Sequence, residues 1–408
     1  PNSSFSFLMD IIDGKLAMVS GAYGTFLYDT PNLWENNRWD ETVPKSIYDL
    51  KNKKVRDFVT LAIDPSNKNN IYYGAWDQGL FEFNGNTMVN QYLAQNTPLD
   101  STFFGTTRVS SLAFDDNNSL WVMSSYSDNP LSVKTASGEW YNYSFPGLLK
   151  TSSYYTKMVI DNNGWKWIAD PRENGILIFD DNQTLSDLSD DRAVYINSSN
   201  TINPSVFDAN LPGDKLHSLA IDLDGEIWIG TNEGVAVINS SADVFNQNIT
   251  ATPIYIQQDG QTQLLLESET VTAIAVDGAN RKWFGTQNSG VFLMSENGTE
   301  EVSHFTTSNS PLFSDNIFDI KINGKTGEVF IATEKGLISY KGTATDNNDE
   351  FDNVFVYPNP VKPDYNGVIA IRGLTFDTDV RITDVSGNMV FQTKSLGGQA
   401  IWDGKDLN

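Results

Sequence analysis

A pattern that recurs seven times constrains this chain more than any other feature of its sequence. Each copy is an apolar strand ending in Asp, a tight turn, a second strand ending like Trp-Ile-Gly-Thr, a short loop with Gly, and a third apolar strand. The clearest copy is LHSLAIDLDGEIWIGTNEGVAVIN at residues 216–239. The others lie at residues 5–28, 59–83, 109–133, 155–179, 271–294 and 317–340. A chain of this kind repeats one structural unit along most of its length.

The spacing of the copies distinguishes between repeat architectures. Their first turns are marked by Asp10, Asp64, Asp115, Asp161, Asp222, Asp277 and Asn323, which lie 46 to 61 residues apart. A four-stranded antiparallel blade with its loops takes about 40–50 residues, and no sustained 3.6-residue period indicates helical repeats. Outer strands are expected at NTMVNQYLA, GEWYNYSF, RAVYINSS, TPIYIQQ and EVSHFTT. The sequence therefore predicts an all-β chain with a seven-bladed β-propeller over residues 1–343.

The repeated residues have mechanical roles in this prediction. The first-turn Asp can accept hydrogen bonds from backbone N–H groups of its hairpin. A large aromatic side chain in the second strand supplies apolar area between neighbouring blades. These aromatics are Trp121, Trp167, Trp228 and Trp283, with Tyr72 and Phe330 as variants. We expect none of these residues to be catalytic.

The seventh copy has no evident outer strand. Residues 344–352 are acidic, form strands poorly and are interpreted as a linker. We therefore expect the fourth strand of the last blade to come from upstream residues that this chain does not contain, or from NVFVYP at 353–358.

Residues 353–408 predict a second module. Short alternating segments, VIAIRGL, DVRITDV, NMVFQTK and QAIWDG, are separated by Ser-Gly-Asn and Gly-Gly turns. This pattern is typical of a small antiparallel, immunoglobulin-like β-sandwich. Pro358 and Pro360 favour an extended entry into it, which suits a domain boundary.

Composition argues against several classes of function. With 52 acidic and 27 basic residues the chain carries a formal charge of −25, which repels nucleic acid. It has no cysteine and hence no disulfide or thiol nucleophile, and no stretch approaches the about 20 apolar residues of a transmembrane helix. Its two histidines, His217 and His304, share no metal-binding spacing, and no nucleophile-elbow motif is present. We therefore expect no catalytic residue, no metal and no cofactor.

The C-terminal residues carry a specific resemblance. The repeat resembles propellers of Bacteroidota envelope proteins, and YPNPV, the ITDVSGN turn and the WDGKDLN ending are similar to C-terminal domains linked to the type IX secretion system. The whole chain thus resembles the propeller-containing surface components of that system's attachment complex. Members of this family carry two tandem propellers and further strands after WDGKDLN. The resemblance therefore implies a fragment with an incomplete C-terminal domain, or else a relative that lacks the first propeller.

The resemblance also implies a function. It indicates a non-enzymatic, exported protein of the cell surface, associated with the outer membrane, whose signal peptide is not in this chain. Its partners would be a sortase-like protein and outer-membrane proteins of the attachment complex, and it would bind anionic lipopolysaccharide. A periplasmic ligand-sensing propeller of a hybrid two-component regulator is the alternative, which YPNPV and WDGKDLN disfavour. A secreted carbohydrate-active enzyme is a third possibility, for which no clustered catalytic residues are apparent.

Aromatic residues outside the repeat positions are the candidate binding residues. Trp76 and Asp77 lie in the loop GAWDQG, Tyr154 and Tyr155 precede the fourth copy, and Trp165 occupies its first turn. An exposed aromatic ring beside a carboxylate suits stacking on a sugar with an acceptor for its hydroxyls. The alternative is that these side chains fill loops or pack against another part of the protein.

Overall fold

The computed structural model describes residues 7–20, 24–29, 33–37, 58–85, 87–173, 175–197, 206–208, 211–213, 215–246, 249–258, 260–351 and 353–405. Within these ranges the chain is all-β apart from one 3-10 turn, η1, at Val244–Asn246. Five of the ten sheets in these ranges have four strands, and neighbouring strands are antiparallel except where β17 runs parallel to β16. The all-β prediction is confirmed.

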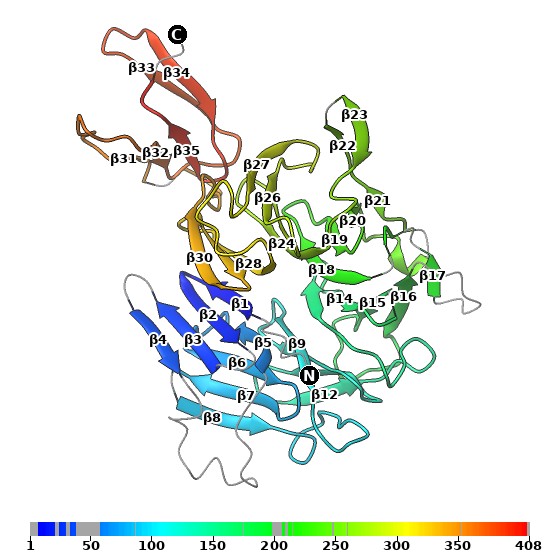
Figure 1. Ribbon diagram of the computed structural model, residues 1–408. Coiled ribbons are helices and arrows are strands. Elements are labelled where there is room, and N and C mark those ends of the chain that lie inside the picture. The colour runs from blue at the N-terminus through cyan, green and yellow to red at the C-terminus, as the bar shows by residue number, and fades with distance from the viewer. Residues whose placement is uncertain are drawn as a thin grey trace.

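Seven sheets, together with a separate β22–β23 hairpin, precede the C-terminal segment in the described part of the chain (Figure 1). The first three are β1–β4 (Phe7–Ile12, Lys15–Ser20, Gly24–Asp29, Leu33–Asn37), β5–β8 (Phe58–Ile63, Asn70–Ala75, Gly79–Asn84, Thr87–Tyr92) and β9–β12 (Val109–Phe114, Leu120–Ser124, Leu131–Lys134, Trp140–Tyr143). The next two are β13–β17 (Lys157–Ile160, Lys166–Asp170, Gly175–Asp180, Arg192–Asn197, Val206–Asp208) and β18–β21 (Leu216–Ile221, Ile227–Thr231, Gly234–Ile238, Thr252–Pro253). The last two are β24–β27 (Val271–Val276, Lys282–Thr286, Val291–Met294, Glu301–Phe305) and β28–β30 (Ile317–Asn323, Glu328–Thr333, Gly336–Lys341).

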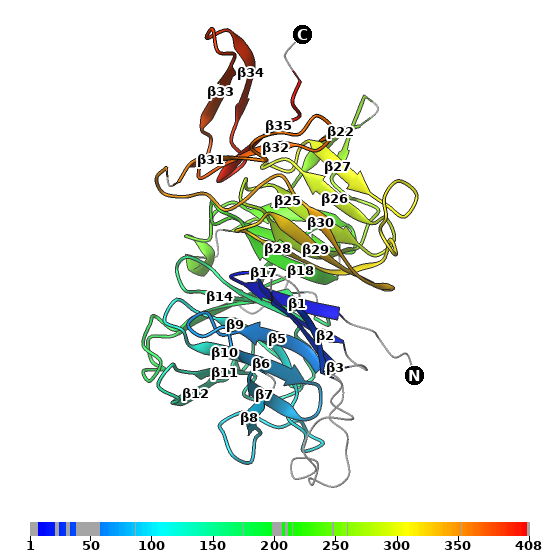
Figure 2. The same ribbon diagram turned by 90° about the vertical axis from the view of Figure 1, so that its left-hand side faces the viewer.

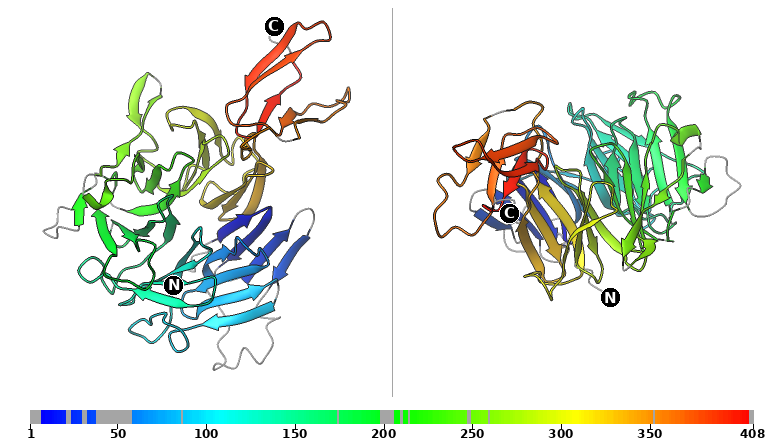
Figure 3. Two further views of the ribbon diagram at one scale, coloured as in Figure 1. Left: turned by 180° about the vertical axis from the view of Figure 1, so that it is seen from behind. Right: turned by 90° about the horizontal axis from the view of Figure 1, so that it is seen from above.

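The first strands of these sheets form a closed ring. Each contacts the first strand of the sheet before it and after it, and β28 contacts β1. Figure 1, and Figure 3 from behind, show that the outer strands lie farther from the centre of the ring than the first strands do. The closing contact is a hydrogen bond in which the Met9 amide donates to Asp319 Oδ2 at 2.8 Å. A similar bond joins the first two sheets, from the Ile63 amide to Asp10 Oδ2 at 2.8 Å.

The repeated Asp and Trp are joined by a hydrogen bond in four of the sheets. In the fifth sheet Asp222 Oδ1 accepts the backbone amides of Asp224 and Glu226, while its Oδ2 accepts the indole N–H of Trp228 at 3.0 Å. The same pair recurs as Trp121–Asp115, Trp167–Asp161 and Trp283–Asp277, at 2.8, 3.0 and 3.1 Å. The predicted amide contacts of the turn Asp are present, and the indole bond adds a link from turn to core.

Two lysines extend this arrangement across sheet boundaries. The Lys282 ammonium pairs with Asp222 Oδ2 at 2.8 Å and lies 4.7 Å from the ring centre of Trp228 in the preceding sheet. Lys166 lies in the same way 3.8 Å from the ring centre of Trp121. Both lysines are almost fully buried, and a cation over an indole face without water between them is strongly attracted to it. Each ring thus contributes electrostatic as well as apolar contacts between sheets.

The first copy of the repeat is offset from its expected position. Asp10 was expected to mark the first turn, but it lies inside β1, and the turn consists of Asp13 and Gly14 with φ of 50° and 84°. A two-residue hairpin of this type needs positive φ at both central residues, which an Asp-Gly pair adopts readily. The assignment of Asp10 to the turn was therefore wrong.

Two predicted outer strands are also placed differently. Only Thr252–Pro253 of TPIYIQQ pairs with β20, whereas β22 (Tyr255–Gln258) leaves the sheet to form a hairpin with β23 (Gln261–Leu264). In the part of the chain that is described, the seventh sheet has three strands, and β31 (Phe355–Tyr357) of NVFVYP pairs with β32 (Ile369–Arg372) instead of β30. The proposal that NVFVYP completes this sheet was wrong, and supply from an upstream segment stays a prediction.

The C-terminal segment lies beside the sixth and seventh sheets (Figure 2). Strands β31, β32 and β35 (Gln399–Trp402) form one sheet, and β33 (Asp379–Thr383) and β34 (Met389–Lys394) form a hairpin packed on it through Val380 and Ile382. The acidic segment contributes to the contact: Thr345 is buried, and its amide donates to Leu396 O at 3.3 Å. Gln399 Nε2 also donates to Thr343 O at 2.6 Å.

The bond between turn and core predicts a cost for removing the indole donor alone. Trp167→Phe leaves Asp161 Oδ2 buried without its indole partner, so we expect the free energy of unfolding to fall by about 1–3 kcal/mol. Trp402→Phe is the matched control, because its indole N–H bonds to a backbone carbonyl in an exposed turn and its loss should cost at most about 0.5 kcal/mol. Urea unfolding followed by circular dichroism measures both. Equal losses in the two variants would contradict the assigned role.

Candidate functional site

The topology sorts the loops of the ring onto two faces. In each sheet the turn between the first and second strands lies at one face, and the turn between the second and third strands lies at the other, together with the segment that enters the next first strand. Trp76 follows β6, Tyr126 follows β10 and Arg172 follows β14, while Arg108 and Tyr154 precede β9 and β13. All five residues therefore gather at one face, and we call them the aromatic–arginine cluster.

Arg108 is the centre of this cluster. Its guanidinium carbon lies 5.1 Å from the ring centres of both Trp76 and Tyr126, and its Nε donates to Asp77 Oδ1 at 2.9 Å. The Trp76 ring meets Tyr126 and Tyr154 edge-on, with centroid distances of 6.0 and 5.4 Å. Such edge-to-face pairs and guanidinium–ring contacts fix ring orientation. The cluster is therefore a preformed set of aromatic surfaces from three consecutive sheets.

Tyr126 adopts a backbone conformation that its side chain disfavours. Its φ is 62°, in the left-handed region that bulky residues rarely occupy, and its amide donates to Ser153 O at 3.1 Å. Strained residues of this kind persist where surrounding contacts hold them, and they concentrate at binding sites. In this conformation the centre of the Tyr126 ring lies 5.1 Å from the guanidinium carbon of Arg108 and 5.7 Å from that of Arg172.

The cluster holds an excess of positive charge. Arg108 is paired with Asp77, and Lys150 pairs with Glu173. Arg172 is exposed, its Nη1 donates to the Tyr126 hydroxyl at 3.4 Å, and it has no carboxylate at salt-bridge distance among the described residues. A guanidinium that lies beside aromatic rings and has no carboxylate partner is suited to a carboxylate or phosphate on a sugar.

A second exposed aromatic pair lies in the long loop between β8 and β9, which ends at the same face. Phe103 and Phe104 are 97% and 79% exposed, and their rings meet edge-on at 5.6 Å. Thr102 and Thr106 close this turn, with the Thr102 amide donating to Thr106 O at 2.7 Å. Two phenyl rings held in water at a loop tip are typical of a surface that contacts an apolar partner.

The structure brings together three of the five predicted site residues. Trp76, Asp77 and Tyr154 lie in or against the cluster, and burial raises the pKa of the Tyr154 hydroxyl. Tyr155 is 1% exposed and belongs to the core between the third and fourth sheets. Trp165 lies on the opposite face, where its ring meets Phe245 edge-on at 4.8 Å.

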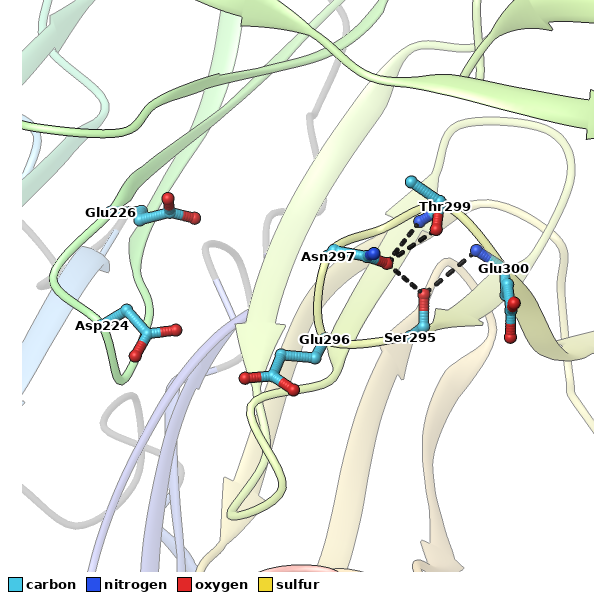
Figure 4. Close-up of a pocket in the computed structure, with 7 residues that line it drawn as sticks. All are labelled: Asp224, Glu226, Ser295, Glu296, Asn297, Thr299 and Glu300. Carbon is cyan, nitrogen blue, oxygen red and sulfur yellow. Dashed lines mark hydrogen bonds between the residues drawn. The ribbon is translucent and has the colours of Figure 1, made fainter.

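That opposite face carries an acidic pocket of about 440 Å³ (Figure 4). Asp224 and Glu226 line it from the β18–β19 turn, and Glu296 and Glu300 line it from the β26–β27 turn. Asn297 Oδ1 accepts from Thr299 and Ser295 and holds the second turn closed. In the described part of the chain no group of His, Cys, Asp and Glu residues is arranged to hold a metal ion. An anionic ligand is repelled here, which favours the aromatic–arginine face for such a ligand.

The fold is that of an all-β protein with a propeller-like ring, and one face of the ring carries the aromatic–arginine cluster. Among solved structures, the chain is similar to PorZ of Porphyromonas gingivalis, described as an essential bacterial surface component of the type-IX secretion system. The TM-score is 0.75 at 28% identity, and the match covers 98% of this chain and 55% of PorZ. The resemblance drawn from YPNPV and WDGKDLN is thereby confirmed.

Other similarities concern the fold alone. Virginiamycin B lyase of Staphylococcus aureus matches with a TM-score of 0.55 at 13% identity, covering 83% of this chain and 95% of the lyase. The extracellular domain of the two component system protein BT3049 of B. thetaiotaomicron reaches a TM-score of 0.43 at 19% identity, covering 98% of this chain and 51% of that domain. No protein-family model and no curated protein matches the chain. Across the described residues, no helix has the length and apolarity needed to span a membrane.

The geometry predicts unequal roles for the two arginines of the cluster. Arg108→Ala removes an ion pair and two ring contacts, so we expect the free energy of unfolding to fall by about 0.5–2 kcal/mol. Arg172→Ala removes one ring contact and one long, exposed hydrogen bond to the Tyr126 hydroxyl, and it should change the free energy of unfolding by at most about 0.5 kcal/mol. Chemical denaturation of the two variants tests this. A larger loss for Arg172→Ala would show that the cluster is not organised around Arg108.

Proposed function

We propose that this chain is a non-enzymatic binding and scaffold protein of the cell surface, acting in the attachment complex of the type IX secretion system. In this role it binds an anionic lipopolysaccharide and a sortase-like partner. The observation that carries the proposal is the aromatic–arginine cluster, which offers aromatic rings and an uncommitted cation on one face of a chain with a formal charge of −25. The similarity to PorZ, a surface component of that system, supports it.

The chemistry of a glycolipid matches the residues of this face. Trp76 and the two tyrosines stack on sugar rings, Asp77 accepts from sugar hydroxyls, and Arg172 pairs with an acidic substituent. Phe103 and Phe104, exposed on the loop between β8 and β9, contact the apolar part of the same molecule. These roles follow from side-chain chemistry and need no catalytic group.

The proposal includes a domain organisation. We infer that the ring is a seven-bladed propeller over residues 1–343, that residues 344–352 connect it to the next module, and that 353–408 form part of an immunoglobulin-like sandwich. The seven sheets and their closing contact support the first inference, and the packing of β33 and β34 on the β31–β32–β35 sheet supports the last.

Binding to immobilised anionic lipopolysaccharide tests the glycolipid role. We expect Trp76→Ala and Arg172→Ala each to weaken binding at least about tenfold, because each removes a direct contact. Trp165→Ala is the matched control, since it removes an aromatic ring from the opposite face and should leave binding unchanged. Surface plasmon resonance at fixed ionic strength measures the affinities. Wild-type protein that does not bind, or a loss only in Trp165→Ala, would contradict the proposal.

A further inference from the structure

A second charged cluster lies inside the ring. A cavity of about 310 Å³ is lined by the first strands of five sheets, β1, β5, β9, β13 and β28. Its apolar lining includes Leu8, Leu61 and Met158, and its charged residues are Asp10, Lys157, Asp319 and Lys321. About 30 Å³ is one water molecule's share of liquid volume, so the cavity can hold a small solute together with several waters.

The two carboxylates of this cavity are committed to backbone amides. Asp10 accepts from the amides of Ile11 and Ile63 at 2.9 and 2.8 Å. Asp319 accepts from those of Ile320 and Met9 at 3.0 and 2.8 Å. These bonds join the first sheet to its neighbours on both sides and orient the carboxylates toward the strands.

The two lysines lack such partners. Lys157 comes from the fourth sheet and Lys321 from the seventh, and both line the cavity, where the charge of Lys321 acts on Lys157. Within the described ranges neither amine has a carboxylate at salt-bridge distance. Asp10 and Asp319 attract both amines electrostatically without forming an ion pair with either. The positive charge of Lys321 and burial lower the pKa of Lys157 to about 8. Two ammonium groups that line one cavity without an anion in contact with either repel each other.

We propose that this cavity is a binding site for a small oxyanion, a carboxylate, sulfate or phosphate group, held between the Lys157 and Lys321 ammonium groups. An oxyanion placed there accepts a charge-assisted hydrogen bond from each lysine and removes their mutual repulsion. The site is separate from the aromatic–arginine cluster, and it does not depend on the function proposed for that face. Because the lysines belong to the fourth and seventh sheets, an occupant links two sides of the ring.

The site has a defined pH dependence. An oxyanion binds when both amines are charged, and the amine of Lys157 loses its proton first, near pH 8 in the empty cavity. Affinity is therefore expected to be full below about pH 7 and to fall as the pH rises through 8, while a bound anion raises the pKa of Lys157. The charged groups that face it are Asp10 on β1, and Asp319 and Lys321 on β28.

Titration calorimetry of the full chain with sodium sulfate and, separately, sodium acetate at constant ionic strength tests the proposal. Both anions keep their charge between pH 6 and 9.5, so the pH series reports on the protein. We expect saturable binding of one or both anions, weakened at least about tenfold in Lys157→Gln and in Lys321→Gln. Lys335→Gln, an exposed lysine at the β29–β30 turn, is the matched control and should bind as the wild type does. Sulfate alone identifies a tetrahedral dianion as the ligand class, and acetate alone a carboxylate.

Lys157→Arg separates anion binding from a structural role of the lysine. Arginine stays charged throughout the accessible pH range, so this variant should retain affinity at pH 9, where the wild type has lost most of it. Circular dichroism confirms that each variant is folded. Absence of saturable binding to wild-type protein, undiminished binding in both Gln variants, or an unchanged pH profile in a folded Lys157→Arg would overturn the proposal.

Discussion

A hydrogen bond from a tryptophan indole to the carboxylate of a turn Asp recurs in four of the seven sheets and joins each of these turns to the core of the ring. One oxygen of Asp222 holds its own hairpin and the other holds Trp228, so turn geometry and packing between sheets are set by one side chain. Lys282 of the following sheet completes the arrangement. Burial alone would raise the pKa of Asp222, but the bonds from Lys282, the Glu226 amide and Trp228 lower it overall, so the carboxylate is ionised where the ring needs it. The stability this provides is present above the unfolded-state pKa of an Asp and is lost as the pH falls through the lower folded-state value.

Much of this fold is readable from the sequence, because a repeat displays the same turn chemistry several times. The Asp, Trp and Gly positions predict the inner three strands of the sheets, and the C-terminal strand segments are also where expected. Prediction failed where the local pattern was ambiguous. The segment IIDG forms its hairpin turn at Asp13–Gly14, although Asp10 aligns in sequence with the turn Asp of the other copies. The segment TPIYIQQ is divided between the fifth sheet and a separate hairpin. Lys166 and Lys282 could not be recognised as buried cations, since their partners belong to other sheets.

The candidate site was predictable in part. Trp76, Asp77 and Tyr154 stand out because they depart from the repeat, and the ring places them together. The alternation of turns between faces separates Trp165 from them, and this could have been worked out from the strand order. Arg108, Tyr126 and Arg172 were not predicted. Basic residues near strand ends are common, and only the folded ring shows that these two arginines lie against the rings of Trp76 and Tyr126. The positive φ of Tyr126 leaves no mark in the sequence.

The ring closes through a contact between the Met9 amide and Asp319, which are 310 residues apart. Bringing together the ends of so long a segment costs conformational entropy that grows with the logarithm of its length, and the gain comes only when both end sheets are formed. Contacts of high sequence separation also slow folding. The side of the first sheet that contacts β28 therefore stays uncovered until the seventh sheet has been synthesised. The interval between making β1 and making β28 is the period in which this protein is most exposed to misassembly, and a folding helper acting on the first sheet would be most useful then.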